Sequence, residues 1–226
     1  MIIILRRASP VHVIRRKLIT RKYKFWIQGG KEMGEIENHL HGSGESTPSF
    51  DRESCVLALA GGTPDVERAL LATDAGEGFL AVGVTVDPAE TVERYRGRTP
   101  SPSGPCAAIR VGPSAGAETI DGAAVESVDD PANLTAVGTT ITSLVDDWEP
   151  GWQLWFDSLG PLVHYTDAES LYRFVDVLGS RAAREDATAF VRLNPAASDD
   201  RTVQQMMSAA DAAARADGDD WRVRRR

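Results

Sequence analysis

The chain has 226 residues, of which 42% are hydrophobic and 26% are charged, a balance typical of a globular domain that stays in solution. It carries 33 acidic against 25 basic residues, and every lysine lies before residue 32, so arginine is the only base of the later chain. Such an acidic surface predicts a salt-adapted cytoplasmic protein, and it argues against nucleic acid as the main partner of residues 53–226. No apolar run reaches the roughly 18 residues of a membrane-spanning helix.

The first 52 residues differ from the rest. Residues 1–32 hold all four lysines and five arginines against one acid, and Arg6 and Arg7 interrupt the only early apolar stretch, which argues against a signal peptide. This segment is either a basic arm for nucleic acid or anionic lipid, or the product of a start codon placed upstream of Met33, which we favour. Residues 33–52 show no periodicity. We therefore expect a disordered leader over residues 1–52 and one domain over residues 53–226.

Strand-like and helix-like runs then alternate. Five apolar runs predict buried strands: Cys55–Ala60, Phe79–Val86, Cys106–Val111, Trp152–Phe156 and Thr188–Leu193. The segment Gly112–Asp129 is less defined, with a possible strand at Ala124–Val128, and Trp221–Val223 after the Asp217–Asp220 turn is expected to be an edge strand. Cys55 and Cys106 lack metal-site spacing, and we expect them to be buried thiols.

Helices are predicted between these strands from cap residues and apolar spacing. Helices are expected to start at Thr63-Pro64, at Asp87-Pro88, at Asp130-Pro131 and at the capping box Thr166/Glu169. The second should continue through Arg94, and the apolar residues of the third should extend to Trp148. A last helix is expected from the apolar spacing of Val203, Met206, Met207, Ala210 and Ala214. This alternation predicts an α/β fold with a three-layer, mainly parallel sheet, in which Trp152–Phe156 is central.

Ligands of such sheets bind where strands lead into the following helices. The residues at these positions are Gly61, Gly62, Thr63, Asp87, Asp157, Ser158, Asn194, Asp199 and Asp200. For Asp157-Ser158 a turn-capping role and a metal or nucleotide role remain equally open, Gly61-Gly62 reads more simply as the tight turn itself, and Asn194 before Pro195 is also a common turn starter.

The order of these elements resembles the RecA-like P-loop ATPases. The glycine turn after the first strand and the later strand ending in Asp157-Ser158-Leu159 resemble the Walker A and Walker B positions. The similarity over residues 53–226 is to the KaiC-type branch, in particular to proteins of salt-loving archaea described as signal-transduction ATPases. In that family the position of Asn194 senses nucleotide.

The glycine turn departs from the family pattern. A working phosphate loop reads G-x-x-x-x-G-K-[ST], in which the lysine neutralises the outer phosphates and the hydroxyl binds magnesium. Counted from Gly62, the last three positions hold Glu67, Arg68 and Ala69, and counted from Gly61 they hold Val66, Glu67 and Arg68. Arg68 could supply charge only in the register from Gly62, while Asp65 and Glu67 would repel a triphosphate.

The resemblance therefore implies a degenerate ATPase without catalytic residues or a required cofactor. We expect a regulatory or signalling module that binds protein partners, and self-association remains open. The alternatives are a nucleotide switch that binds Mg-ATP weakly, with Asp157 as the magnesium ligand, and a nucleic-acid or membrane adaptor that uses residues 1–32.

Overall fold

The structure is a computed structural model that describes residues 20–23, 36–39, 48–50, 52–61, 78–98, 104–113, 119–120, 123–217 and 220–226. The chain forms two compact units, residues 1–46 and 47–226. In the first unit, β1 (Thr20–Tyr23) and β2 (Ile36–His39) pair antiparallel, although we expected no regular structure there. Backbone hydrogen bonds between strands require no apolar alternation, so composition gave no sign of this pairing.

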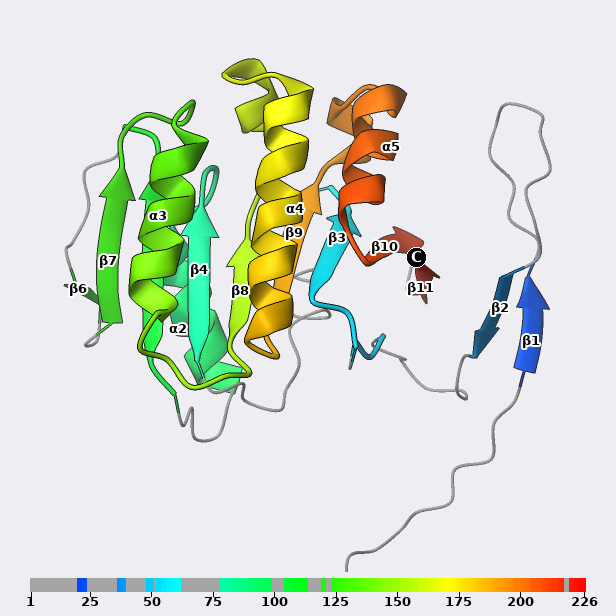
Figure 1. Cartoon of the computed structure of the whole chain (residues 1–226), viewed down its shortest axis with the longest axis horizontal. Helices are drawn as coiled ribbons and strands as arrows, with labels where there is room; N and C mark the ends of the chain where they lie inside the picture. Colours follow the sequence, from blue (N-terminus) through cyan, green and yellow to red (C-terminus); the bar gives the residue numbers. More distant parts are fainter. Residues whose placement is uncertain are drawn as a thin grey trace, which may run out of the picture. The chain divides into compact units, whose positions relative to one another are not determined.

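The second unit is built on a nine-stranded sheet with the order β11-β10-β3-β9-β8-β4-β5-β7-β6 (Figure 1). The strands are β3 (Cys55–Leu59), β4 (Phe79–Gly83), β5 (Cys106–Val111), β6 (Thr119–Ile120), β7 (Ala123–Val128), β8 (Gln153–Phe156), β9 (Thr188–Leu193), β10 (Ala212–Asp217) and β11 (Asp220–Arg225). Neighbours from β10 to β7 pair in parallel, and only the edge strands β11 and β6 pair antiparallel. The five predicted strands thus share one mostly parallel sheet, and the predicted central position of β8 is confirmed.

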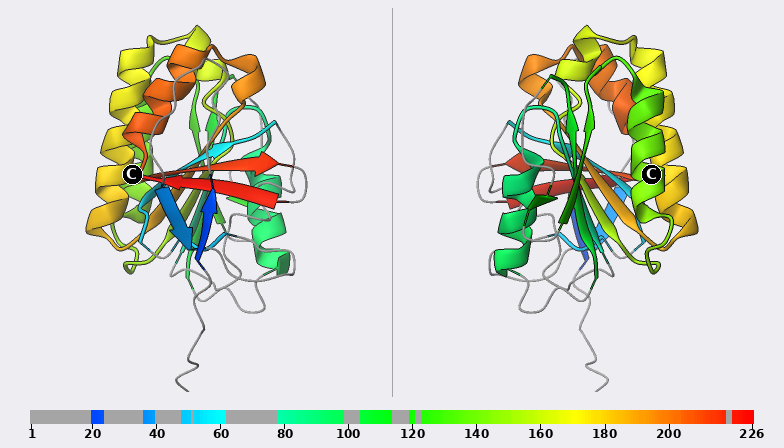
Figure 2. Two further views of the ribbon diagram at one scale, coloured as in Figure 1. Left: turned by 90° about the vertical axis from the view of Figure 1, so that its right-hand side faces the viewer. Right: turned by 90° about the vertical axis from the view of Figure 1, so that its left-hand side faces the viewer.

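Helices cover both faces of the sheet and give three layers (Figure 2). One face carries α2 (Pro88–Arg98), and the other carries α3 (Leu134–Val145), α4 (Ala168–Arg184) and α5 (Asp200–Ala209). Two short 3-10 helices, η1 (Pro161–His164) and η2 (Pro195–Ala197), follow β8 and β9. Alternate residues of each inner strand enter two apolar cores, as Leu57 does on the α4 side and Val56 on the α2 side. Within the described ranges, no helix has the length and apolarity to cross a bilayer.

Both cysteines are buried and unpaired, as predicted. Cys55 on β3 lies under α4, where Gly179 brings the helix backbone so close that an added Cβ would lie 2.8 Å from the Cys55 Cβ. Burial, reinforced by Asp211 and Asp176, raises the pKa of the Cys55 thiol to about 12. This thiol therefore stays neutral in the folded protein at physiological pH.

The helix starts shift by one to three residues from those predicted. Asn133, not Asp130, caps α3 by accepting the N–H of Ala136, and Asp167, not Thr166, caps α4 by accepting the N–H of Ser170. Competing cap residues lie close together in both segments, and the helix axis required by packing selects between them. Trp148 lies beyond α3, and α2 continues to Arg98 instead of Arg94.

The largest difference lies after α5. The predicted apolar stripe continued to Ala214, but the helix ends at Ala209 and residues 212–217 form β10. Alanine has the highest intrinsic helix propensity, so the sequence favoured the helix. The parallel ladder to β3, with Ala212 opposite Val56, supplies backbone partners and buries Ala212 and Ala214, and this tertiary pairing outweighs the local propensity.

Candidate functional site

The predicted site residues gather at the carboxyl edge of four neighbouring strands. The backbone N–H of Ala60 reaches the carbonyl of Leu193 at 3.2 Å, that of Leu159 reaches the carbonyl of Arg192 at 2.9 Å, and that of Asp157 reaches the carbonyl of Val82 at 2.9 Å. The ends of β3, β9, β8 and β4 are thereby linked in series. Gly61, Asn194, Asp157 and Ser158 consequently follow adjacent strand ends.

Asp157 is the best-defined polar group at this edge. Only 3% of its surface is exposed, and both carboxylate oxygens accept hydrogen bonds from the segment that follows β4. Oδ1 accepts the backbone N–H of Val84 at 2.7 Å, and Oδ2 accepts those of Thr85 at 2.8 Å and Val86 at 2.9 Å. The Thr85 hydroxyl donates a further hydrogen bond to Oδ2. One carboxylate therefore satisfies three consecutive backbone amides and a hydroxyl.

This arrangement determines what Asp157 can do chemically. A magnesium ion would have to compete with four donors for the oxygen lone pairs, and the three amides it displaced would lose their acceptor. The side chain points toward the β4 loop and holds it against the end of β8. Asp157 therefore caps the loop after β4, and not the turn that follows it in the sequence, which was the capping role expected.

The β4 loop itself is tightly folded at Gly83. A Cβ at this position would lie 2.3 Å from the carbonyl oxygen of Val86 and 2.5 Å from Cδ of Pro88. Only glycine permits this close return of the chain, which brings residues 84–86 over the strand end. The loop and Asp157 therefore form one closed unit, which we call the β4 clamp: residues 83–86 together with Asp157.

A buried arginine lies beside the β4 clamp. Arg192, next to last in β9, donates a hydrogen bond from Nε to the carbonyl oxygen of Asp157 and is 8% exposed. Burial lowers the pKa of its guanidinium, and the Asp157 charge opposes that shift. On β5, Arg110 is also buried and forms an ion pair with Asp87 at 3.2 Å. Together these arginines connect strand ends to the loops that follow β8 and β4.

The sequence reading missed both arginines. A visible signal was present, because each interrupts an otherwise apolar strand one position before its end, in the runs TAFVRL and CAAIRV. A charged side chain in a buried strand requires a partner, and the strand end offers free carbonyl and carboxylate oxygens. The identity of those partners depended on strand order.

The glycine turn is described only at its first residue. Gly61 is exposed, and an added Cβ there would meet no atom of the described residues within 4 Å. Gly62, Thr63 and Arg68 lie outside the described residues, as do Asp65 and Glu67. Ser158 is buried directly after Asp157.

Asn194 acts as a cap for its own turn. Its Oδ1 accepts the N–H of Ala196 at 3.0 Å, which starts η2. The Asn194 backbone carbonyl accepts the Ser198 hydroxyl at 3.0 Å. The side-chain oxygen that could contact a nucleotide is therefore engaged within residues 194–196.

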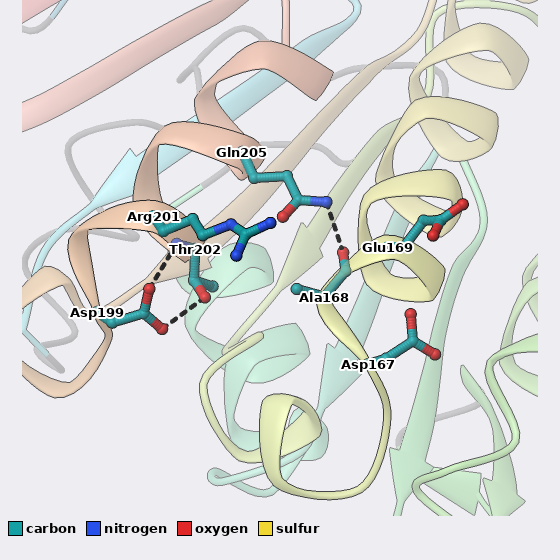
Figure 3. Close-up of a pocket in the computed structure, with 7 residues that line it drawn as sticks. All are labelled: Asp167, Ala168, Glu169, Asp199, Arg201, Thr202 and Gln205. Atoms are coloured by element: carbon teal, nitrogen blue, oxygen red, sulfur yellow. Dashed lines mark hydrogen bonds between the residues drawn. The ribbon is translucent and has the colours of Figure 1, made fainter.

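A hollow of about 640 Å³ lies between the first turns of α4 and α5 (Figure 3). Two of its acids, Asp167 and Asp199, cap their own helices, and Glu169 pairs with Arg173. Hydrogen bonds from the Ser170 backbone and hydroxyl lower the pKa of Asp167, and those from the Thr202 hydroxyl and backbone lower the pKa of Asp199. Gln205 closes one side by donating from Nε2 to the carbonyl of Ala168 at 3.3 Å. The described residues contain no group of three or more side chains placed to hold a metal ion.

Comparison with known proteins gives a family and a fold. Residues 53–215 match a family described as "Family of unknown function (DUF7504)". A solved structure from Pyrococcus horikoshii OT3, from a structural study of project PH0250, superposes with a TM-score of 0.52 at 10% sequence identity, covering 76% of this chain and 86% of that chain. At this identity the likeness concerns the fold alone. A search of curated proteins finds no match.

Proposed function

The chain belongs to the DUF7504 family, and from that premise we propose that residues 53–226 form a non-catalytic RecA/KaiC-like domain that works as a regulatory or signalling module through protein contacts. The observation that carries this proposal is the closed hydrogen bonding of Asp157, the residue at the Walker B-like position.

The strand order supports the RecA-like part of the proposal. Strand β9 lies between β3, which leads into the glycine turn, and β8, which ends in Asp157. In the family that the sequence resembles, a strand ending in Asp-Ser-Leu is followed by a loop, a helix and a strand ending in Asn or Gln, and β8, α4 and β9 follow this order. The three layers and the parallel pairing of β3, β9, β8 and β4 agree with the same architecture.

Two features support the loss of catalysis. The chain has no lysine after Lys31, so no lysine of the domain can neutralise the outer phosphates of a nucleotide. Asp157 uses its oxygens to hold the β4 clamp together, so magnesium binding would require that clamp to open. Both changes remove charge-assisted contacts that ATP hydrolysis needs.

A nucleotide-binding switch remains the second candidate because Gly61 is exposed at the end of β3 and no described atom would contact a Cβ there. In this version ATP or ADP would bind without turnover. The interpretation of residues 1–32 as a nucleic-acid or membrane arm concerns a segment whose side chains lie outside the described residues.

Phosphate release and nucleotide-induced thermal stabilisation of the full chain, measured with Mg-ATP in molar potassium chloride, test the proposal. We expect no phosphate release above background and no change in Tm at 1 mM Mg-ATP. Turnover that disappears in D157N but persists in the exposed cap variant D199N would overturn the non-catalytic assignment. A Tm increase without turnover would select the switch instead.

A further inference from the structure

The last two strands form a two-stranded ribbon at the edge of the sheet. β10 and β11 pair antiparallel from Ala212 opposite Arg225 to Asp217 opposite Asp220, and β11 pairs with no other described strand (Figure 2, left). Its outer backbone groups therefore form an open strand edge in the described part of the domain.

One face of this ribbon is lined by arginine. The register places Arg215 directly opposite Arg222, and Arg224 opposite Ala213. All three arginines are exposed, and none of the described residues accepts a hydrogen bond from Arg215 or Arg224. The opposite face carries the buried Ala214 and Val223 together with Arg225, which forms an ion pair with Glu53. We call Arg215, Arg222 and Arg224 the arginine face.

This placement is unfavourable for the ribbon alone. Like charges directly opposite each other across an antiparallel pair destabilise it. Charged residues can protect an edge strand from aggregation, but that role requires charge only on β11, the edge strand. It does not explain the arginine on β10. In a chain of formal charge -8, the concentration of arginine on one face is typical of a surface that binds a complementary, negatively charged group.

We propose that the arginine face binds an extended acidic polypeptide, which adds to the open edge of β11 as a further strand and sets alternate carboxylates on the side of the ribbon that carries Arg215 and Arg224. Residues two apart in a strand are about 6.6–6.8 Å apart, so acids at every second position of such a segment match the arginines one to one. Guanidinium groups bind carboxylates through two parallel hydrogen bonds, which persist where salt screens simple charge attraction. This inference rests on the proposed protein-binding function and gives it a partner chemistry.

Space for the acidic side chains exists beside the ribbon. A hollow of about 220 Å³ lies between α5 and the ribbon and is lined by Arg224, Arg226, Gln204 and Ser208, among others, and by one acid, Asp211, whose carboxylate accepts the backbone N–H groups of Ser54 and Cys55. Arg226 is held at its rim, donating from Nη1 to the carbonyl of Ser208 at 3.0 Å and from its backbone N–H to that of Asp211 at 2.8 Å. The basic surface thus continues from the ribbon toward α5.

A polypeptide fits this surface better than a nucleic acid. The strand edge offers backbone donors and acceptors that a peptide backbone can match and a phosphodiester chain cannot. Residues 53–226 are acidic as a whole, so a long polyanion extending beyond the ribbon would be repelled.

Binding of labelled probes to the full chain tests the proposal by fluorescence anisotropy. The probe is an acetylated eight-residue peptide of alternating glutamate and threonine. It is compared with a peptide that has lysine in place of glutamate and with twelve-residue oligothymidylate. Two further glutamate peptides are N-methylated at alternate backbone amides, one at the odd positions and the other at the even positions. The variant R215Q/R224Q removes two charges of the arginine face. The control R173Q/R201Q removes two exposed charges from α4 and α5.

We expect the glutamate peptide to bind and the lysine analogue not to bind. R215Q/R224Q should weaken binding tenfold or more and the control less than twofold. Only one of the two methylated versions should lose binding, because alternate N–H groups face a neighbouring strand.

Each other outcome overturns the inference. Absence of peptide binding removes it, equal binding of both methylated peptides excludes strand addition, and tighter arginine-dependent binding of oligothymidylate assigns the face to nucleic acid. None of these results affects the test of Asp157, which lies in a different part of the domain, so failure here is distinguishable from failure of the proposed function.

Discussion

Removing the Asp157 carboxylate should destabilise the domain even without any nucleotide. In D157A the amides of Val84, Thr85 and Val86 lose a buried acceptor, although Thr85 and Val86 themselves are exposed and can be rehydrated. A hydrogen bond to a charged group contributes about 1.5–3 kcal/mol, and relaxation of the loop recovers part of the sum. We therefore expect a loss of about 3–4 kcal/mol in the free energy of unfolding, a large share of the 5–15 kcal/mol typical of a domain.

Urea unfolding of the full chain in molar potassium chloride measures this loss. D199N is a suitable control, because asparagine caps a helix about as well as aspartate and Asp199 is exposed. It should leave the urea midpoint close to that of the wild type, as is usual for an exposed substitution that keeps the helix cap. A D157A protein as stable as the wild type would refute the clamp role and return Asp157 to the metal or nucleotide role.

Three further predictions concern packing and pH. G179A should destabilise the protein by about 1–3 kcal/mol, because its Cβ would lie 2.8 Å from the Cβ of Cys55. G138A should stabilise α3 by about 0.5–1 kcal/mol, because the nearest atom to its Cβ lies at 3.9 Å. Urea unfolding measures both changes. The raised pKa of the Cys55 thiol stabilises the fold at pH values below 9.0, the pKa of the unfolded thiol, and this contribution should disappear between pH 9 and about 12. The C55A variant should not show this loss of stability. In the native wild-type protein, Cys55 should also resist alkylation by iodoacetamide at pH 8. The lowered pKa values of Asp167 and Asp199 stabilise the fold above pH 4, and this stability should be lost as the pH drops below 3.8. The Tm of the wild type should therefore fall more steeply below pH 3.8 than the Tm of D167N/D199N.

The main strands could be predicted because their burial appears as continuous apolar runs. Leu57 and Val56 are both buried on opposite faces of β3, so the run reads as a strand covered on two sides, and the same holds for β9 around Phe190 and Val191. Strand β10 could not be predicted in this way, since its alanines favour helix locally and only the ladder with β3 makes them a strand.

The candidate site was predictable in position but not in role. An acid directly after a buried strand indicated that Asp157 would lie at the carboxyl edge, and it does. The direction of its carboxylate depends on β4 being the neighbour of β8 and on Gly83 allowing the chain to return over the strand end. Those are tertiary facts that no spacing in the sequence encodes.

Amide hydrogen exchange at Val84, Thr85 and Val86 tests the central claim most directly, because these three amides are the donors that occupy Asp157. In the wild-type chain we predict protected amides whose exchange rates do not change when Mg-ATP is added, and faster exchange of all three amides in D157A, which has no side-chain acceptor. Rapid exchange at all three positions in the nucleotide-free protein, slowed by Mg-ATP, would contradict the account and show that Asp157 is free to serve a nucleotide site.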